Sequence, residues 1–487
     1  MNYISTRGLS PAVTAEEAMI NGLAPDGGLY LPETVPVLTE EEKRRLQEAD
    51  YEETALLILR KYLSESAFPD GKMKEAVRDA YRSFDGPEPV RLVPLGEDLH
   101  ALELWHGPTS AFKDMALQLF PRILFIGKAS AGNTEENWIL TATSGDTGKA
   151  ALEGFRDVPG MRVFVFYPHN GVSRVQELQM ATQEGENVFV CAVEGNFDDT
   201  QTGVKKLFSD PALREKLGRR GIRLSSANSI NWGRLLPQIV YYAWAAARVS
   251  GSSGTPVDFV VPTGNFGNIL AGELARRMGC PVGKLVCASN ANRVLTDFFT
   301  TGIYDRRRLF RRTTSPSMDI LISSNLERLL FLESGDHFAV RGWMGDLAEK
   351  GWYRIPDSLK DRLSGRFLCG SADDGEAAEA VREARDRFRW TADPHTAVGF
   401  SVLEKLRRSG SLECCPAVLV STASPYKFAP DVLKALTGRD ETVFRAMDEL
   451  ERLTGDRRPA ALKALREKRI RFESVCRPEE MASVLTI

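Results

Sequence analysis

Between residues 138 and 208, short β-rich runs alternate with amphipathic helical stretches, and this alternation strongly limits the fold. The predicted strand–helix pairs are 138–143 with 149–155, 162–167 with 173–183, and 187–193 with 198–208. A further pair is predicted at 258–262 and 269–278, and a late strand at 417–422. Strands that are separated by helices pair in parallel, so the sequence predicts an α/β fold with helix-covered parallel sheets.

The chain has 487 residues, which is enough for two or three domains. A formal net charge of -3 makes nucleic acid or an anionic membrane surface an unlikely partner. No stretch approaches the roughly 18 apolar residues of a membrane span, and the N-terminus lacks a secretory signal pattern. The seven cysteines contain no CxxC pair, so we expect reduced thiols and a cytoplasmic location. With five histidines and no HExxH, the sequence predicts no metal site.

A polar glycine loop, TSGDTG at 143–148, follows the first predicted strand and precedes a helix. Backbone N–H groups at such a helix N-terminus form an anion-binding nest, to which Ser144 and Thr147 can add hydroxyl donors. A nucleotide P-loop would need glycine at 143 and serine or threonine at 150, where this chain has Thr143 and Ala150. A phosphate or other substrate anion therefore fits better than a nucleotide, and a plain glycine turn is the alternative.

A second loop, TGNFGN at 263–268, again lies between a predicted strand and a helix. It is not the GxGxxG fingerprint, so a dinucleotide is not indicated. Glycines with polar side chains between them suit a phosphate monoester, which backbone amides and asparagine side chains can surround.

Lys113 lies in the segment HGPTSAFKD at 106–114, directly after the apolar pair Ala111 and Phe112. A lone lysine is usually a solvated surface charge, but an apolar setting lowers the pKa of a lysine. The neutral amine is the form that attacks an aldehyde. Together with two phosphate-type loops, this lysine predicts a Schiff base to pyridoxal phosphate (PLP).

Across nearly its whole length the chain resembles the threonine synthase family in its longer bacterial and fungal form. The resemblance rests on ordered motifs: YISTRG at 3–8, GLAPDGGLYLP at 22–32, HGPTSAFKD at 106–114, TATSGDTG at 141–148, SANSINWGRLLPQ at 226–238, PTGNFGN at 262–268, DPHTAVG at 393–399 and STASPYKF at 421–428. It implies a fold-type II PLP enzyme, like the tryptophan synthase β-subunit. Two α/β domains would flank the cofactor, with an N-terminal segment over 1–95, a smaller domain over 96–225 and a larger one over 226–487.

The resemblance also implies roles for individual residues. Lys113 matches the Schiff-base lysine, and Thr422 matches the residue that bonds the pyridine nitrogen. The residues that match the cofactor-phosphate loop are Gly264, Asn265, Phe266, Gly267 and Asn268, and those that match the substrate loop are Ser144, Asp146 and Thr147. The family usually has histidine where this chain has Ser424; we expect this difference to affect the surroundings of the cofactor and no catalytic role.

Arg234 is a candidate partner for a substrate carboxylate or phosphate, because its guanidinium offers a bidentate fork. A surface ion pair is the alternative. His395 follows a helix-start signal, Asp393-Pro394, and we interpret it as a structural histidine.

The implied reaction converts O-phospho-L-homoserine and water to L-threonine and phosphate by β,γ-elimination and hydration, in a monomer or dimer. The alternative is a related phospho-lyase that gives 2-oxobutyrate, ammonia and phosphate from the same substrate. A PLP-binding module without catalysis is disfavoured by the presence of Lys113, Thr422 and both loops.

Overall fold

A six-stranded sheet forms one half of the computed structural model, which describes residues 1–412 and 415–485. Its strand order is β13-β10-β9-β14-β4-β3, and every neighbouring pair is parallel except β4 with β3. The strands are β3 (Arg91–Pro94), β4 (Leu99–Glu103), β9 (Val257–Pro262), β10 (Val282–Ser289), β13 (Phe367–Ser371) and β14 (Ala417–Ser421).

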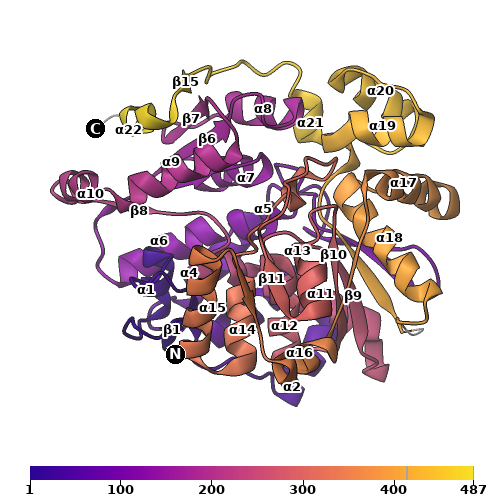
Figure 1. Ribbon diagram of the computed structural model, residues 1–487, viewed down its shortest axis with the longest axis horizontal. Coiled ribbons are helices and arrows are strands. Elements are labelled where there is room, and N and C mark those ends of the chain that lie inside the picture. The colour runs from indigo at the N-terminus through magenta and orange to yellow at the C-terminus, as the bar shows by residue number, and fades with distance from the viewer. Residues whose placement is uncertain (413–414, 486–487) are drawn as a thin grey trace.

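A five-stranded, fully parallel sheet forms the other half, in the order β15-β7-β6-β5-β8. Its strands are β5 (Glu136–Ala142), β6 (Met161–Pro168), β7 (Val188–Val193), β8 (Ile222–Ser225) and β15 (Val475–Cys476). Figure 1 shows the yellow C-terminal tail running back to β7, so the last strand of the chain joins the sheet of residues 136–225.

The predicted strand–helix alternation is confirmed, with boundaries that differ by no more than three residues. Helices α7 (Asp146–Phe155), α8 (Arg174–Ala181), α9 (Phe197–Ser209) and α12 (Gly267–Arg277) lie where the sequence predicted them. The apolar character of the strands explains why the prediction succeeded. Strands β6 and β9 are buried along almost their whole length, as expected for strands covered on both faces.

The longest helix, α11 (Trp232–Ser250), is almost entirely buried and packs against α12 and α3. Helix α18 (Pro394–Arg408) packs against the six-stranded sheet, and α10 (Pro211–Gly218) packs against β8 of the five-stranded sheet. Further helices are α5 (Lys113–Leu117), α6 (Phe120–Ser130), α17 (Asp374–Phe388), α19 (Ala429–Thr437), α20 (Val443–Thr454), α21 (Ala460–Ala464) and α22 (Met481–Val484). Asp393 caps α18 by accepting from the His395 N–H, with Pro394 at the first helical position, as the sequence predicted.

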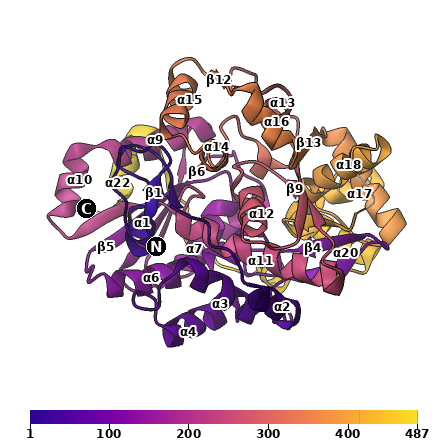
Figure 2. The same cartoon turned by 90° about the horizontal axis from the view of Figure 1, so that it is seen from below.

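The N-terminal segment pairs β1 (Tyr3–Ser5) with β2 (Tyr30–Pro32) and adds four helices. These helices are α1 (Ala15–Asn21), α2 (Glu40–Glu48), α3 (Tyr51–Tyr62) and α4 (Asp70–Tyr81). Figure 2 shows α2, α3 and α4 along one side of the molecule, next to α11. Arg7 forms an ion pair with Glu327 at 2.9 Å, which ties this segment to the middle of the chain.

Residues 294–364 contain α13 (Val294–Thr301), α14 (Leu326–Ser334), α15 (His337–Glu349) and α16 (Asp357–Ser364), with the small antiparallel pair β11 (Ile303–Asp305) and β12 (Trp352–Arg354). A single 3-10 turn, η2 (Pro316–Met318), lies before α14.

The predicted boundaries at 95 and 225 stay predictions. The strand order nevertheless shows that β4, from the range 96–225, belongs to the six-stranded sheet, whereas β15 crosses to the other sheet. None of the helices over residues 1–412 and 415–485 combines the length and the apolar character that a membrane span requires.

Candidate active site

Lys113, Thr422 and the two glycine loops follow the carboxyl ends of parallel strands. Lys113 comes after β4, Thr422 after β14 and the loop 263–268 after β9, and these three strands are neighbours in one sheet. The loop 143–148 comes after β5 of the other sheet. Ligands in α/β proteins bind at such strand ends. Here the structure brings all eleven predicted site residues to one cavity of about 1570 Å³.

Lys113 is held in place by the end of β14. The Phe112 N–H donates to the Thr422 carbonyl at 2.8 Å, and Ala111 pairs with Ala423 as an isolated bridge. The lysine is only 8% exposed, and its ammonium lies 4.8 Å from the centre of the Phe112 ring. Burial lowers the pKa of Lys113, which excludes the solvated surface charge and favours the neutral amine.

The loop 263–268 presents donors toward the cavity. Phe266 has a left-handed φ of 64°, and α12 begins at the next residue. The first N–H groups of α12 therefore lack partners within the helix. Asn268 accepts hydrogen bonds from the hydroxyls of Tyr241 and Tyr242 at 2.7 and 2.8 Å, so its Nδ2 faces away from them. Within the described chain, this buried Nδ2 has no hydrogen-bond partner.

The loop 143–148 is organised by Thr143, whose hydroxyl accepts from the N–H groups of Gly145 and Gly148 at 3.0 and 2.9 Å. Gly145 has a φ of 132°, and an added Cβ would lie 2.2 Å from the Gln176 side chain. Only glycine fits there, because both the backbone angle and the space exclude a side chain. Ser144 and Thr147, which flank this position, both line the cavity and are half-buried.

Asp146 lies at the centre of a buried polar cluster. Its Oδ2 is 3.3 Å from the Lys113 ammonium and accepts from the Ser317 hydroxyl at 3.0 Å. Its Oδ1 is 2.7 Å from the ammonium of Lys427 and accepts from Gln176 Nε2 at 2.9 Å. Burial would raise the pKa of Asp146, but the ammoniums of Lys427 and Lys113 hold it well below the usual value. Asp146 is therefore an ionised carboxylate.

Ser317 and Lys427 were not among the predicted site residues. Lys427 follows β14 between two aromatic residues, Tyr426 and Phe428, so the criterion of apolar neighbours that pointed to Lys113 also applies to it. Ser317 lies on η2 in an irregular stretch, and its sequence carries no comparable signal.

His395 uses both ring nitrogens for structure. Its Nδ1 lies 2.8 Å from Asp393 Oδ1, and its Nε2 accepts from the backbone N–H of Ser317 at 3.2 Å. A histidine that is engaged on both sides holds its neighbours in place, which agrees with the structural interpretation made from the sequence.

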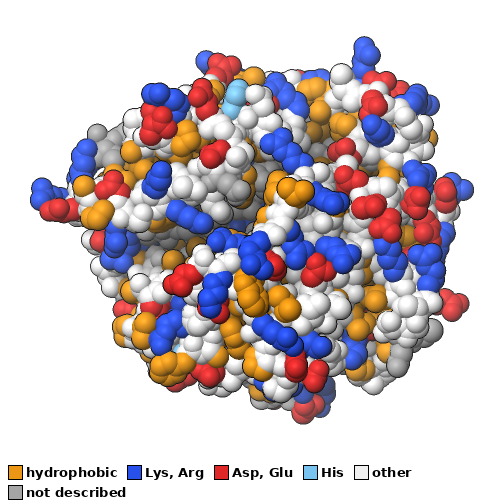
Figure 3. All heavy atoms as spheres, in the orientation of Figure 1, with side chains coloured by type: hydrophobic (Ala, Val, Ile, Leu, Met, Phe, Trp, Pro, Cys, Tyr) orange, Lys and Arg blue, Asp and Glu red, His pale blue; other side chains and the backbone are white. Residues whose placement is uncertain are grey.

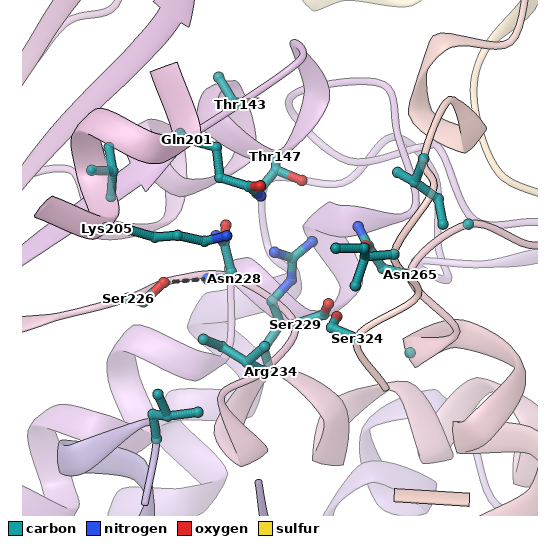
Figure 4. A pocket seen from close by; sticks show the side chains of 18 of the residues that line it. Thr143, Thr147, Gln201, Lys205, Ser226, Asn228, Ser229, Arg234, Asn265 and Ser324 are labelled. Carbon is teal, nitrogen blue, oxygen red and sulfur yellow. Dashed lines mark hydrogen bonds between the residues drawn. The ribbon is translucent and has the colours of Figure 1, made fainter. Parts of the chain in front are cut away.

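Arg234 points into the cavity, as Figure 4 shows. It is 5% exposed and donates to the Ala227 carbonyl at 2.8 Å, and none of the described carboxylates pairs with it. Burial lowers its pKa to about 10. The alternative of a surface ion pair is thereby wrong, and an unpaired buried guanidinium is suited to an anionic ligand.

Further polar groups occupy the side of the cavity beneath α9. Gln201 and Lys205 project from α9 toward Asn228, and Thr147 lies beside them (Figure 4). Asn228 donates its backbone N–H to the Ser226 hydroxyl at 3.2 Å, and Asn228 lines the cavity. Figure 3 shows lysine and arginine side chains gathered around a hollow near the middle of this face.

Family models match almost the entire chain. They are described as threonine synthase N terminus (residues 2–81), pyridoxal-phosphate dependent enzyme (85–341) and threonine synthase, C-terminal (396–484).

Individual relatives agree with these models. The chain is 41% identical to a threonine synthase of Pseudomonas aeruginosa, over 90% of this chain and 91% of the relative. It is 40% identical to human threonine synthase-like 1, over 89% of this chain and 60% of that protein. A PLP-bound threonine synthase structure from Brucella melitensis superposes with a TM-score of 0.88 at 38% identity, covering 99% of each chain. The chain therefore belongs to the threonine synthase family of pyridoxal-phosphate-dependent enzymes.

Proposed function

We propose that this enzyme converts O-phospho-L-homoserine and water to L-threonine and phosphate. The observation that carries the proposal is the unpaired, buried Arg234, which faces the same cavity as the buried amine of Lys113 and the two anion-type loops. A substrate with an amine, a carboxylate and a phosphate supplies a partner for each of these features.

The loop 263–268 suits the phosphate of PLP. Among the described residues, Nδ2 of Asn268 has no hydrogen-bond partner, and no side chain caps the N–H groups at the start of α12, as an anion site requires. Gly264 lets the backbone of Ser317 lie close to this loop, because an added Cβ would be 2.9 Å from the Ser317 carbonyl oxygen. Thr422 is 6% exposed and donates its backbone N–H to the Thr396 hydroxyl at 3.2 Å, and its own hydroxyl would bind the pyridine nitrogen.

When bound, PLP supplies an electron sink for negative charge on the substrate carbon next to the amine. The chain itself supplies the base. With its amine free, Lys113 would remove a proton from that carbon, because its lowered pKa favours the neutral form. The burial of Lys113 and Asp146 keeps bulk water away from this proton transfer.

The substrate anions are assigned to the remaining cationic and hydroxyl groups. Arg234 would bind the carboxylate or the phosphate through its free guanidinium nitrogens. Ser144 and Thr147 offer hydroxyls beside the start of α7, where the helix dipole favours negative charge.

One incubation separates this function from its rival. The holoenzyme is mixed with O-phospho-L-homoserine, and phosphate, threonine and 2-oxobutyrate are measured together. Threonine equal to phosphate supports the synthase, which the similarity to named threonine synthases over about nine-tenths of the chain favours. 2-Oxobutyrate equal to phosphate would establish the phospho-lyase, and no phosphate release would refute both.

We also propose that the enzyme is cytoplasmic and acts as a monomer or dimer. Its thiols support the location, because Cys191, Cys280, Cys287, Cys369 and Cys476 form no disulfide, whereas Cys414 lies outside the described residues. Sedimentation of the purified holoenzyme measures the oligomeric state, and a species larger than a dimer would contradict the proposal.

A further inference from the structure

Lys427 is a fully buried lysine at the candidate active site. It belongs to the 3-10 turn η3 (Pro425–Phe428), which follows β14 and Thr422. Its side chain has 0% exposure, lies 2.7 Å from Asp146 Oδ1 and donates to the Thr109 carbonyl at 3.0 Å. A buried ammonium is costly unless it is paired and hydrogen-bonded, and this one has both kinds of partner.

Asp146 has little capacity left for a substrate. Two ammoniums, the Ser317 hydroxyl and the Gln176 amide together supply four contacts to its two oxygens. A carboxylate in this position would also repel the carboxylate and phosphate of the substrate. Its direct partner on the cavity side is the amine of Lys113, so Asp146 is better suited to act on that amine than on the substrate.

We propose that Lys427 is a positioning residue that acts through Asp146: it fixes this carboxylate, which in turn holds the nitrogen of Lys113 and sets its protonation. The proposal rests on the function proposed above, in which Lys113 binds the cofactor and moves a proton. Lys427 would thus affect the reaction without contacting the substrate.

The geometry distinguishes the two lysines that share Asp146. Lys427 has the shorter contact, a second acceptor in Thr109, and no exposed surface. Lys113 has the longer contact of 3.3 Å and lines the cavity. Lys113 is therefore the partner that can leave Asp146 to react, while Lys427 stays.

The charges around the cluster give the direction of the effect. Burial lowers the pKa of Lys113, Asp146 opposes this shift, and the positive charges of Arg234 and Lys427 add to it. His395 also faces Asp146, from α18, and Asp114 faces Lys427, from α5. Without the charge of Lys427, the negative charge of Asp146 acts on Lys113 alone. This favours a protonated nitrogen at Lys113. Removing the charge of Asp146 has the opposite effect.

The test is a pH titration of the visible absorbance of the lysine-bound cofactor, without substrate. We expect Lys427→Met to raise the midpoint by about one pH unit, a tenfold change in the protonation equilibrium. Lys427→Gln keeps an N–H donor for Asp146 and should also raise the midpoint. If Lys427→Met does not fold, Lys427→Gln serves as the test of the proposal. Asp146→Asn should lower the midpoint by a similar amount.

Two controls separate positioning from general damage. In the Asp146→Asn background, Lys427→Met should shift the midpoint by less than half as much as in the parent enzyme, because its effect passes through Asp146. Lys149→Met removes another buried lysine, which pairs with Glu153 at 2.9 Å and not with Asp146, and it should leave the midpoint unchanged.

A midpoint that is unchanged or lowered in both neutral variants of Lys427 would overturn the proposal, as would an undiminished shift in the Asp146→Asn background. Because no substrate is present, these outcomes are independent of which product the enzyme forms. A wild-type enzyme with no visible cofactor band would instead refute the proposed function, and this inference with it.

Discussion

Gly154 allows two helices of the active site to touch backbone to backbone. It lies near the end of α7, and a Cβ added there would be 1.8 Å from the carbonyl oxygen of Leu117, the last residue of α5. Lys113 begins α5 and Asp146 begins α7. We therefore expect Gly154→Ala to move these two side chains relative to each other.

The size of the effect follows from that contact. Real Cβ atoms essentially never approach other atoms within 3.0 Å, so the two helices must separate by about 1 Å. Overpacking of this kind costs about 1–3 kcal/mol, while replacing glycine by alanine within a helix gains up to about 1 kcal/mol. We expect a net loss of roughly 1–2 kcal/mol in the free energy of unfolding. A misplacement of about 1 Å at a reacting group reduces kcat by about 100-fold.

The measurements are urea unfolding of the holoenzyme and steady-state phosphate release. Gly342→Ala is the matched control, because Gly342 also lies inside a helix, α15, but an added Cβ meets nothing within 4 Å. The control should be as stable as the parent or slightly more stable, with unchanged kcat. If Gly154→Ala matched the control in both stability and kcat, the reasoning from the α5–α7 contact would be refuted.

Three further perturbations have directions that the structure determines. Arg328→Met should lower the free energy of unfolding by about 3 kcal/mol in urea denaturation, because it removes a fully buried donor from the carbonyls of Tyr30, Ser229 and Ile230. Arg234→Met should raise KM by about tenfold or more while the enzyme still takes up the cofactor, because a charge-assisted contact with the substrate is lost; an unchanged KM would contradict its assignment. Burial opposes ionisation of Glu153, but the charges of Lys149 and Arg156 lower its pKa to about 2. The contribution of Glu153 to the free energy of unfolding is thus complete above about pH 4.5 and is lost as pH falls toward 2. In acid unfolding, the stability of Glu153→Gln should therefore fall less than that of the parent enzyme over this pH range.

Local sequence patterns predicted the parts of the fold whose causes are local. The strand–loop–helix units appear where apolar runs alternate with amphipathic ones, and Asp393-Pro394 begins α18 because a capping carboxylate and a proline act within one turn. Lys113 was found because its apolar neighbours lie next to it in the sequence. The family resemblance then supplied the roles of residues such as Thr422, which no local pattern indicates.

Features that depend on residues distant in the sequence could not be predicted from local patterns. The pairing of β15 with β7 joins residues 475–476 to a strand almost 300 positions earlier, and two apolar residues in a charged tail carry no signal for it. Ser317 reaches Asp146 from an irregular stretch, so its position follows from the packing of η2 against the site. The aromatic neighbours of Lys427 are a local signal. Its partner Asp146, however, lies in the loop after β5 of the other sheet, so the ion pair could not be predicted from the sequence around Lys427.

The ion pairs of Asp146 also predict where the cavity can open. Asp146 follows β5 of one sheet, while Lys113 and Lys427 follow β4 and β14 of the other, so separating the sheets at this point would break buried ion pairs. Breaking such a pair costs about 3–5 kcal/mol. Lys205 on α9 is exposed, and no ion pair to it is formed within the described residues, so movement of α9 carries no such cost.

We therefore expect substrate to enter beneath α9, with the start of α7 fixed. Amide hydrogen exchange of the holoenzyme should be slow at 146–152 and faster over 199–206, and Asp146→Asn should speed exchange at 146–152. Equal exchange rates in the two segments of the parent enzyme would contradict this view, because they would mean that the ion pairs at Asp146 do not hold the two sheets together.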